Sequence, residues 1–130
     1  MVILLDTHIL LWLLNEPGRV PRRIMVAVED IANQVLFSPV TIFEVATKAL
    51  LGRPDFPFEP QETHRAAITA GLRELPLKAS AAARIGELRM QHRDPFDRLL
   101  LAQALDEDAI LATVDRKMAA HASVVRMITP

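Results

Sequence analysis

The stretch "VILLDTHILLWLL", residues 2–14, holds the pattern on which the predicted fold depends. Its first apolar run, residues 2–5, ends at Asp6, which is typical of a short strand buried on both faces of a sheet. The apolar residues 9–14 follow almost at once and predict a buried helix. A buried strand that leads directly into a helix is typical of α/β proteins with a parallel sheet.

The same alternation of strand and helix continues along the chain. Further strands are predicted at 35–37, 74–77, 109–115 and 123–129, and further helices at 20–32, 38–52, 59–72, 80–91 and 94–108. No internal repeat, low-complexity tract or domain linker interrupts this order. The sequence therefore predicts an α/β sandwich in which helices flank a central, mainly parallel sheet.

The composition limits the possible partners and surroundings. The chain has 130 residues, 51% of them hydrophobic, and a formal net charge of −1, so any polyanion must be met by local charge or by metal. It has no cysteine, which excludes disulfides and thiolate metal sites. Asp6 and His8 interrupt the apolar start, no basic segment precedes it, and no apolar stretch is long enough for a membrane span. We expect a cytoplasmic protein without a membrane partner.

Four carboxylates are predicted to meet at one edge of the sheet. Asp6 and Asp115 each follow a strand, Glu44 lies in the second turn of a helix that leaves a strand, and Asp97 lies in the first turn of the helix before the strand at 109–115. Ligands bind beyond the carboxyl ends of parallel strands. Converging carboxylates repel one another unless a cation compensates them. Oxygen ligands alone suit Mg²⁺ or Mn²⁺, and such sites serve phosphoryl chemistry.

The segment "HRDPFDRLLLAQA", residues 92–104, contains two aspartates with different predicted roles. Asp94 precedes Pro95, and an acidic N-cap followed by proline is a strong helix start. Asp97 follows in the first helical turn, where the helix dipole favours negative charge. We predict that Asp94 starts the helix and that Asp97 faces the metal.

Each acidic residue also has a local alternative. Asp6 and Asp115 suit the N-cap position of the segments that follow them. Glu44 can pair with Lys48 at i+4 on the same helix. The histidines show no spacing for a metal pair or a catalytic triad, and are predicted to be structural or exposed: His8, His64, His92 and His121.

The segments "LLDTHILLWLL", "SPVTIFEVATK", "HRDPFDRLLLAQA" and "ILATVD", in this order and spacing, resemble the PIN-domain nucleases. More narrowly, they resemble the VapC-type toxins of type II toxin–antitoxin systems. The resemblance implies a PIN-like three-layer sandwich in a single domain over residues 1–130. It also implies an endoribonuclease that depends on Mg²⁺, with Mn²⁺ as a substitute, and that a small cognate antitoxin neutralises. The expected assembly is a homodimer or a toxin–antitoxin hetero-oligomer.

The resemblance also implies roles for individual residues. The acidic catalytic and metal-binding positions correspond to Asp6, Glu44, Asp97 and Asp115. The small-hydroxyl positions correspond to Ser38, Thr41 and Thr113. Further candidates for contact with the substrate lie next to the acids: Thr7, Arg98 and Arg116. The role of His8 stays open.

The predicted reaction is hydrolysis of RNA phosphodiester bonds by water that the metal activates. The alternatives are a PIN nuclease that acts in RNA processing or DNA cleavage, and a PIN-like binding module without catalysis. A receiver-like phosphoacceptor domain also places acids and Mg²⁺ at strand ends. That domain requires a lysine near the last strand, where this chain has Arg126.

Overall fold

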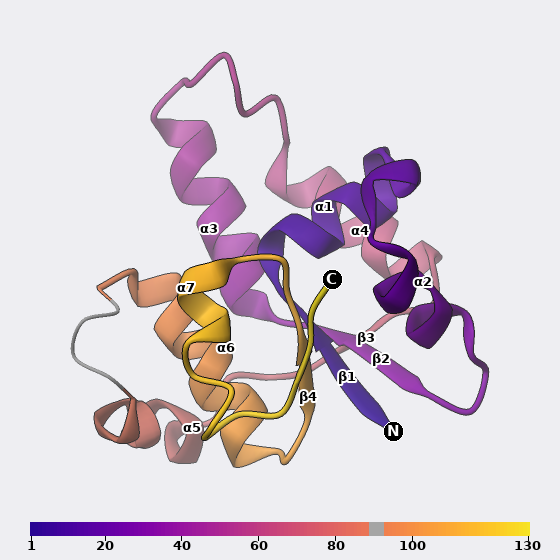
Figure 1. The fold of residues 1–130 in the computed structure, drawn as a ribbon. Helices are drawn as coiled ribbons and strands as arrows, with labels where there is room; N and C mark the ends of the chain where they lie inside the picture. Colours follow the sequence, from indigo (N-terminus) through magenta and orange to yellow (C-terminus); the bar gives the residue numbers. More distant parts are fainter. Residues whose placement is uncertain (89–92) are drawn as a thin grey trace.

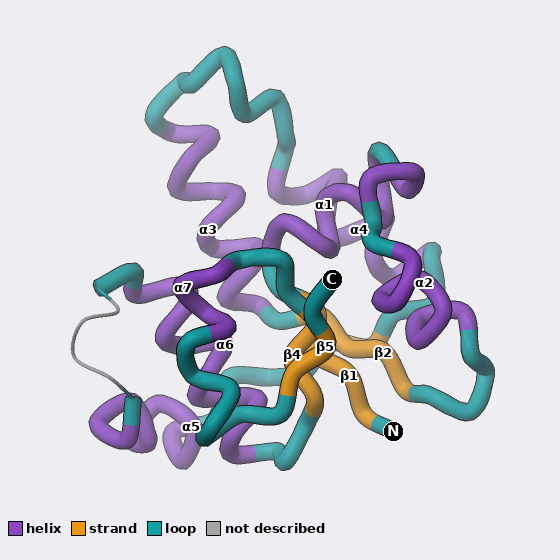
Figure 2. Tube along the Cα trace, in the orientation of Figure 1, coloured by secondary structure: helices purple, strands orange, loops and turns teal. Residues whose placement is uncertain are grey.

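In the computed structural model, which describes residues 1–88 and 93–130, the strands form one parallel sheet (Figures 1 and 2). The strands are β1 Val2–Leu5, β2 Gln34–Phe37, β3 Arg73–Glu74, β4 Ile110–Ala112 and β5 Met127–Ile128. Their order across the sheet is β3-β2-β1-β4-β5, and each neighbouring pair is parallel. β1 lies at the centre, with Ile3 paired to Val35 on one side and to Ile110 on the other. The predicted α/β class with a mainly parallel sheet is confirmed.

Helices connect the strands and cover both faces of the sheet (Figure 1). They are α1 Thr7–Asn15, α2 Arg22–Glu29, α3 Pro39–Leu50, α4 Pro60–Thr69, α5 Ala79–Ala83, α6 Pro95–Asp106 and α7 Arg116–Ala119, with 3-10 turns η1 Pro17–Arg19 and η2 Arg84–Glu87. None of these helices in the described part of the chain is both long and apolar enough to cross a membrane.

Alternate side chains of β1 enter two separate cores, one on each face of the sheet. Ile3 and Leu5 pack in a cluster with residues of α1, α2 and α4. Leu4 points the other way and packs in a cluster dominated by α6. Two apolar layers around one sheet define the three-layer sandwich, and they explain why the strand is apolar at every position.

Several helices begin where polar residues cap them. The Oδ1 of Asp94 accepts hydrogen bonds from the backbone N–H groups of Phe96 (2.9 Å) and Asp97 (3.2 Å), which confirms Asp94 as the N-cap of α6. Ser38 caps α3 in the same way, through a 3.0 Å hydrogen bond from the N–H of Val40, and Pro39 follows it.

The structure differs from the predicted elements at the edges of the sheet. The strand predicted at 74–77 is only β3, because Pro76 has no N–H to continue the ladder. The helix predicted at 59–72 ends at Thr69, and Gly71 follows with a φ of +86°. Residues 123–129 form a strand only at β5, because hydrogen-bonded turns occupy the preceding residues.

The helix predicted at 80–91 is also different. It is divided into α5 and the tighter turn η2, which end at Ala83 and Glu87. Residues 89–92 lie outside the described residues, so the predicted end of this helix and the prediction for His92 lie outside them too.

Candidate functional site

The predicted acidic positions lie at the end of the sheet where β1, β2 and β4 finish and the next helices begin (Figure 1). Asp6 follows β1 and Asp115 follows β4, which is the direct neighbour of β1. Glu44 lies in α3, which begins just after β2, and Asp97 lies in the first turn of α6. Three strands that end together thus bring residues from distant parts of the chain to one edge.

Asp6 is a buried carboxylate, with 2% of the residue exposed. Its Oδ1 accepts a 2.8 Å hydrogen bond from the N–H of Ile9 and so caps α1, while its Oδ2 accepts a hydrogen bond from the Thr113 hydroxyl. The pKa of Asp6 is raised from 3.8 to about 6, chiefly because the carboxyl is buried. The hydrogen bonds from Thr113 and Ile9 and the charge of His8 act in the opposite direction, while the charge of Asp115 adds to the increase. At neutral pH the protein therefore keeps this carboxylate ionised at a cost in stability.

Glu44 is the second buried acid, with 4% of the residue exposed. Its Oε1 accepts a 2.7 Å hydrogen bond from the Thr7 hydroxyl, which lies 3.2 Å from the hydroxyl of Thr41. Its Oε2 lies 2.7 Å from the Nζ of Lys48, so the i+4 ion pair is present. This network ties the start of α1, next to Asp6, to the middle of α3.

Thr113 connects the ends of β1 and β4. Its hydroxyl donates to Asp6 and accepts a 3.0 Å hydrogen bond from the N–H of Asp115. Asp115 also serves as the N-cap of α7, because its Oδ1 accepts a 2.8 Å hydrogen bond from the N–H of Lys117. The capping alternatives for Asp6 and Asp115 are thus both present, and each leaves the residue at the predicted edge.

Over residues 1–88 and 93–130, no three acidic or histidine side chains gather closely enough to hold a metal ion together. The acidic side chains contact nearby donors instead. Both oxygens of Glu44 are bonded to Thr7 and Lys48, and one oxygen of Asp115 caps α7. Asp97 is half-buried at the start of α6.

The chemistry of the donors fits a hard divalent cation. The acidic side chains at this edge offer only oxygen atoms, which Mg²⁺ and Mn²⁺ prefer. The buried Asp6 supplies a second argument, because a bound cation would offset the cost of its ionised form. The residues that would hold such an ion are Asp6, Glu44, Asp97 and Asp115.

The predicted substrate-binding positions Ser38 and Arg98 form hydrogen bonds within the protein, whereas Arg116 is exposed. Ser38 is fully buried and donates to the Oε1 of Gln103, whose Nε2 donates to the carbonyl of Leu75 at 3.0 Å. The Arg98 guanidinium donates to the carbonyl of Ile85 at 3.0 Å and so ties α6 to η2. Arg116, the first residue of α7, is exposed beside Asp115.

Sequence reasoning missed Gln103, which holds Ser38 and the segment after β3 in place. Its signal in the sequence is a single polar side chain within the apolar run 99–105, at a position that α6 buries. A buried polar residue requires hydrogen-bond partners, and the partners here lie at the base of the site.

The family model of the PIN domain matches residues 3–124, so the chain belongs to the PIN domain family, and the predicted family is confirmed. This membership supports the expectation of an enzyme that acts on nucleic acid. No curated protein matches the chain by sequence.

Several solved structures share the fold. VapBC2 from Rickettsia felis, bound to a DNA fragment from its promoter, matches with a TM-score of 0.72 and 18% identity, over 100% of this chain and 99% of that one. VapBC-1 from nontypeable Haemophilus influenzae matches with a TM-score of 0.70 and 21% identity, over 99% and 98%. A toxin–antitoxin complex from Klebsiella pneumoniae matches with a TM-score of 0.63 and 23% identity, over 98% and 97%. At these identities the likeness establishes the fold.

Proposed function

We propose that this protein is the toxin of a type II toxin–antitoxin system and acts as an endoribonuclease that depends on Mg²⁺ or Mn²⁺. The observation that carries the proposal is Asp6, a carboxylate that is buried at the carboxyl edge of a PIN-domain sheet and kept there at a cost. A group held in an unfavourable ionisation state within a site is more often there for function than for stability.

The chain's own residues divide the work. Asp6, Glu44, Asp97 and Asp115 would hold the cation, which would supply a Lewis acid for the scissile phosphate and for water. Thr113 and Thr7 orient the carboxylates of Asp6 and Glu44 through the hydrogen bonds that they donate.

The remaining substrate contacts follow from position. Arg116 stands exposed beside Asp115, where a guanidinium can bind a phosphate of the RNA backbone. Ser38 and Thr41 are fully buried, and Thr41 lies 3.2 Å from the Thr7 hydroxyl that donates to Glu44, so both residues support the site from within the protein. Arg98 contributes by fixing the start of α6 against η2, because its guanidinium is bonded there.

The toxin role is supported by the names of the solved relatives, which are toxin–antitoxin complexes from several bacteria. We infer that a small antitoxin binds this chain and restrains it, and that the chain assembles as a homodimer or as a toxin–antitoxin hetero-oligomer. A PIN nuclease that acts in RNA processing, or on DNA, has the same acids, and the substrate separates these alternatives.

Growth of bacteria that express the chain tests the toxin role. Expression of the wild type alone should arrest growth and produce cleaved RNA, while Asp6→Ala should remove both effects. Asp30→Ala, which removes an exposed aspartate far from the site, should keep them. Co-expression of the small neighbouring gene product should restore growth. Normal growth with abundant folded wild-type protein and intact RNA would contradict the proposal.

A further inference from the structure

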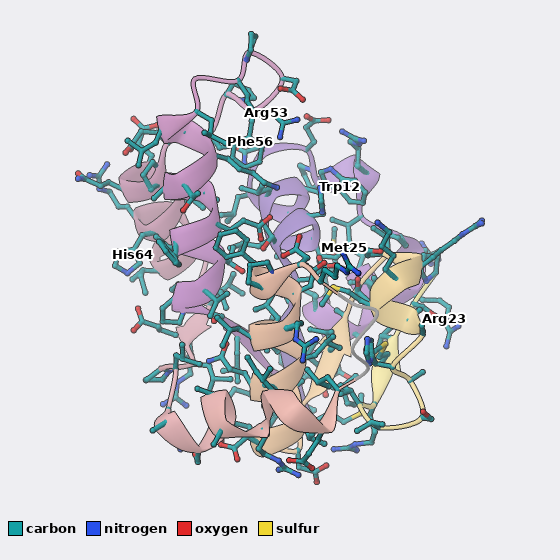
Figure 3. The ribbon with its side chains drawn as sticks, turned by 90° about the vertical axis from the view of Figure 1, so that its left-hand side faces the viewer. Trp12, Arg23, Met25, Arg53, Phe56 and His64 are labelled. Atoms are coloured by element: carbon teal, nitrogen blue, oxygen red, sulfur yellow. The ribbon has the colours of Figure 1, made fainter. Side chains whose placement is uncertain are left out.

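Three planar side chains form a row that begins beside the acidic edge. His8 and Trp12 lie one turn apart on α1, with ring centroids separated by 6.2 Å and planes inclined by 55°. The guanidinium carbon of Arg19, in η1, lies 4.6 Å from the centroid of the Trp12 ring. Figure 3 shows Trp12 on α1 in the upper part of the molecule. The row starts two residues after Asp6.

The row is accessible along its length. His8 is exposed, Trp12 is half-buried, and 58% of the Arg19 side chain is exposed. Trp12 packs its inner side against the core cluster of α1, α2 and α4, so the protein fixes the position of the indole ring. The outer side of the row thus presents planar groups to solvent, with the Arg19 guanidinium over the Trp12 ring.

Core packing accounts for the inner side of Trp12, but not for the exposed His8 and Arg19 beside it. Arg19 pairs with Glu16 at 3.5 Å, but both side chains are more than half exposed, and exposed ion pairs contribute little to stability. An exposed imidazole beside the buried carboxylate adds nothing to the core. Aromatic rings and guanidinium groups at the surface are, in contrast, what proteins use to bind the faces of unpaired bases.

Resting on the proposed function, we propose that His8, Trp12 and Arg19 form a stacking surface for an unpaired base of the RNA substrate. The substrate is then single-stranded where it meets α1, because a base within a duplex cannot offer its face to these side chains. The Arg19 guanidinium also suits a phosphate next to such a base.

Trp12 is the only tryptophan of the chain, so its fluorescence reports directly on this surface. The full chain with Asp97→Asn, in EDTA, is titrated with a fluorescently labelled 12-nucleotide RNA, first as a single strand and then as a perfect duplex. The single strand should quench Trp12 saturably, and the duplex should leave the emission unchanged. Anisotropy of the label measures binding independently of the tryptophan.

Variants separate stacking from charge. Arg19→Lys keeps the charge but loses the planar group, so it should weaken single-strand binding nearly as much as Arg19→Ala, by about 5- to 150-fold for one stacked base. Trp12→Phe keeps a ring and should bind more tightly than Trp12→Leu. Arg73→Ala, which removes a charge from β3 at the far side of the sheet, should bind as the parent does.

The inference is overturned if the single strand binds without quenching Trp12, if the duplex quenches equally, or if Arg19→Lys binds with full affinity. It is also overturned if RNA leaves Trp12 unchanged and only the antitoxin protein alters its emission. Cleavage by the wild type with Mg²⁺ separates the two proposals. If RNA is cleaved while Trp12 stays unaffected, only the stacking surface is wrong. If single strands quench Trp12 but nothing is cleaved, only the nuclease is wrong.

Discussion

Replacing Asp6 by Asn should stabilise the metal-free protein at neutral pH. Burial raises the pKa of Asp6 from 3.8 to about 6, so below pH 3.8 the carboxyl is protonated in both the folded and the unfolded chain. As pH rises, the unfolded chain loses this proton first. The folded state then binds more protons than the unfolded state, and the free energy of unfolding falls until Asp6 ionises in the folded protein as well. Above about pH 6 the carboxyl is ionised in both states, and the folded protein bears the full free-energy cost of burying its charge.

The magnitude follows from the same values. The gap between 3.8 and about 6 corresponds to about 3 kcal/mol at pH 7. Asparagine keeps the cap, because its Oδ1 can accept a hydrogen bond from the N–H of Ile9. Its Nδ2 can donate to the hydroxyl of Thr113, which also accepts a hydrogen bond from the N–H of Asp115. The variant should therefore match the wild type near pH 3.5 and exceed it by up to about 3 kcal/mol at pH 7, or roughly 10 °C in Tm.

Urea unfolding in EDTA, followed by circular dichroism from pH 3.5 to 7.5, measures this difference. Asp30→Asn is the matched control, because Asp30 also accepts a hydrogen bond from a backbone N–H, that of Ala32, but is exposed. The free energy of unfolding of this variant should stay within about 0.5 kcal/mol of the wild type. Millimolar Mn²⁺ should then stabilise the wild type and not Asp6→Asn. If the difference in stability between the variant and the wild type does not grow between pH 4 and 7, burial of Asp6 does not destabilise the folded protein.

Three further predictions concern the contacts around the site. Asp94→Ala should lower the free energy of unfolding by about 0.5–2 kcal/mol through loss of the α6 cap and should keep activity, as urea unfolding and RNA cleavage measure; a stable but inactive variant would contradict it. Lys48→Met should lower the free energy of unfolding by about 1.5–3 kcal/mol, because the buried Glu44 loses a charged partner at 2.7 Å. Adding Glu44→Gln to this variant should recover part of the loss. Gln103→Leu should lower stability by about 2 kcal/mol, since the carbonyl of Leu75 and the buried Ser38 lose their partner, whereas the exposed Gln61→Leu should change it little.

The strands and the main helices were predictable because their signals are local. The apolar run before Asp6 and the cap-proline pairs at Ser38 and Asp94 each predict an element without knowledge of the rest of the chain. The edge elements were less predictable, since a two-residue strand such as β3 depends on the neighbour it pairs with rather than on its own residues.

The positions of the acids were predictable, but their contacts were not. The order of the segments places Asp6 and Asp115 at one edge, because β1 and β4 are neighbours. The sequence cannot show that Thr113 bridges them, or that Arg19 folds back over Trp12. These contacts join residues that are distant in the chain or lie in irregular turns, and no periodicity records them.

Cleavage of RNA by the purified chain, with Asp94 or Asp97 replaced by Asn, distinguishes a helix cap from a metal-dependent acidic site. The two residues lie three apart at the start of α6. Asparagine serves as an N-cap nearly as well as aspartate, and at position 97 it keeps the shape of the side chain, so both variants should fold. With Mg²⁺ the wild type and Asp94→Asn should cleave RNA, Asp97→Asn should not, and EDTA should abolish every activity. Cleavage by Asp97→Asn at the wild-type rate, or by the wild type in EDTA, would contradict the account of a metal-dependent acidic site.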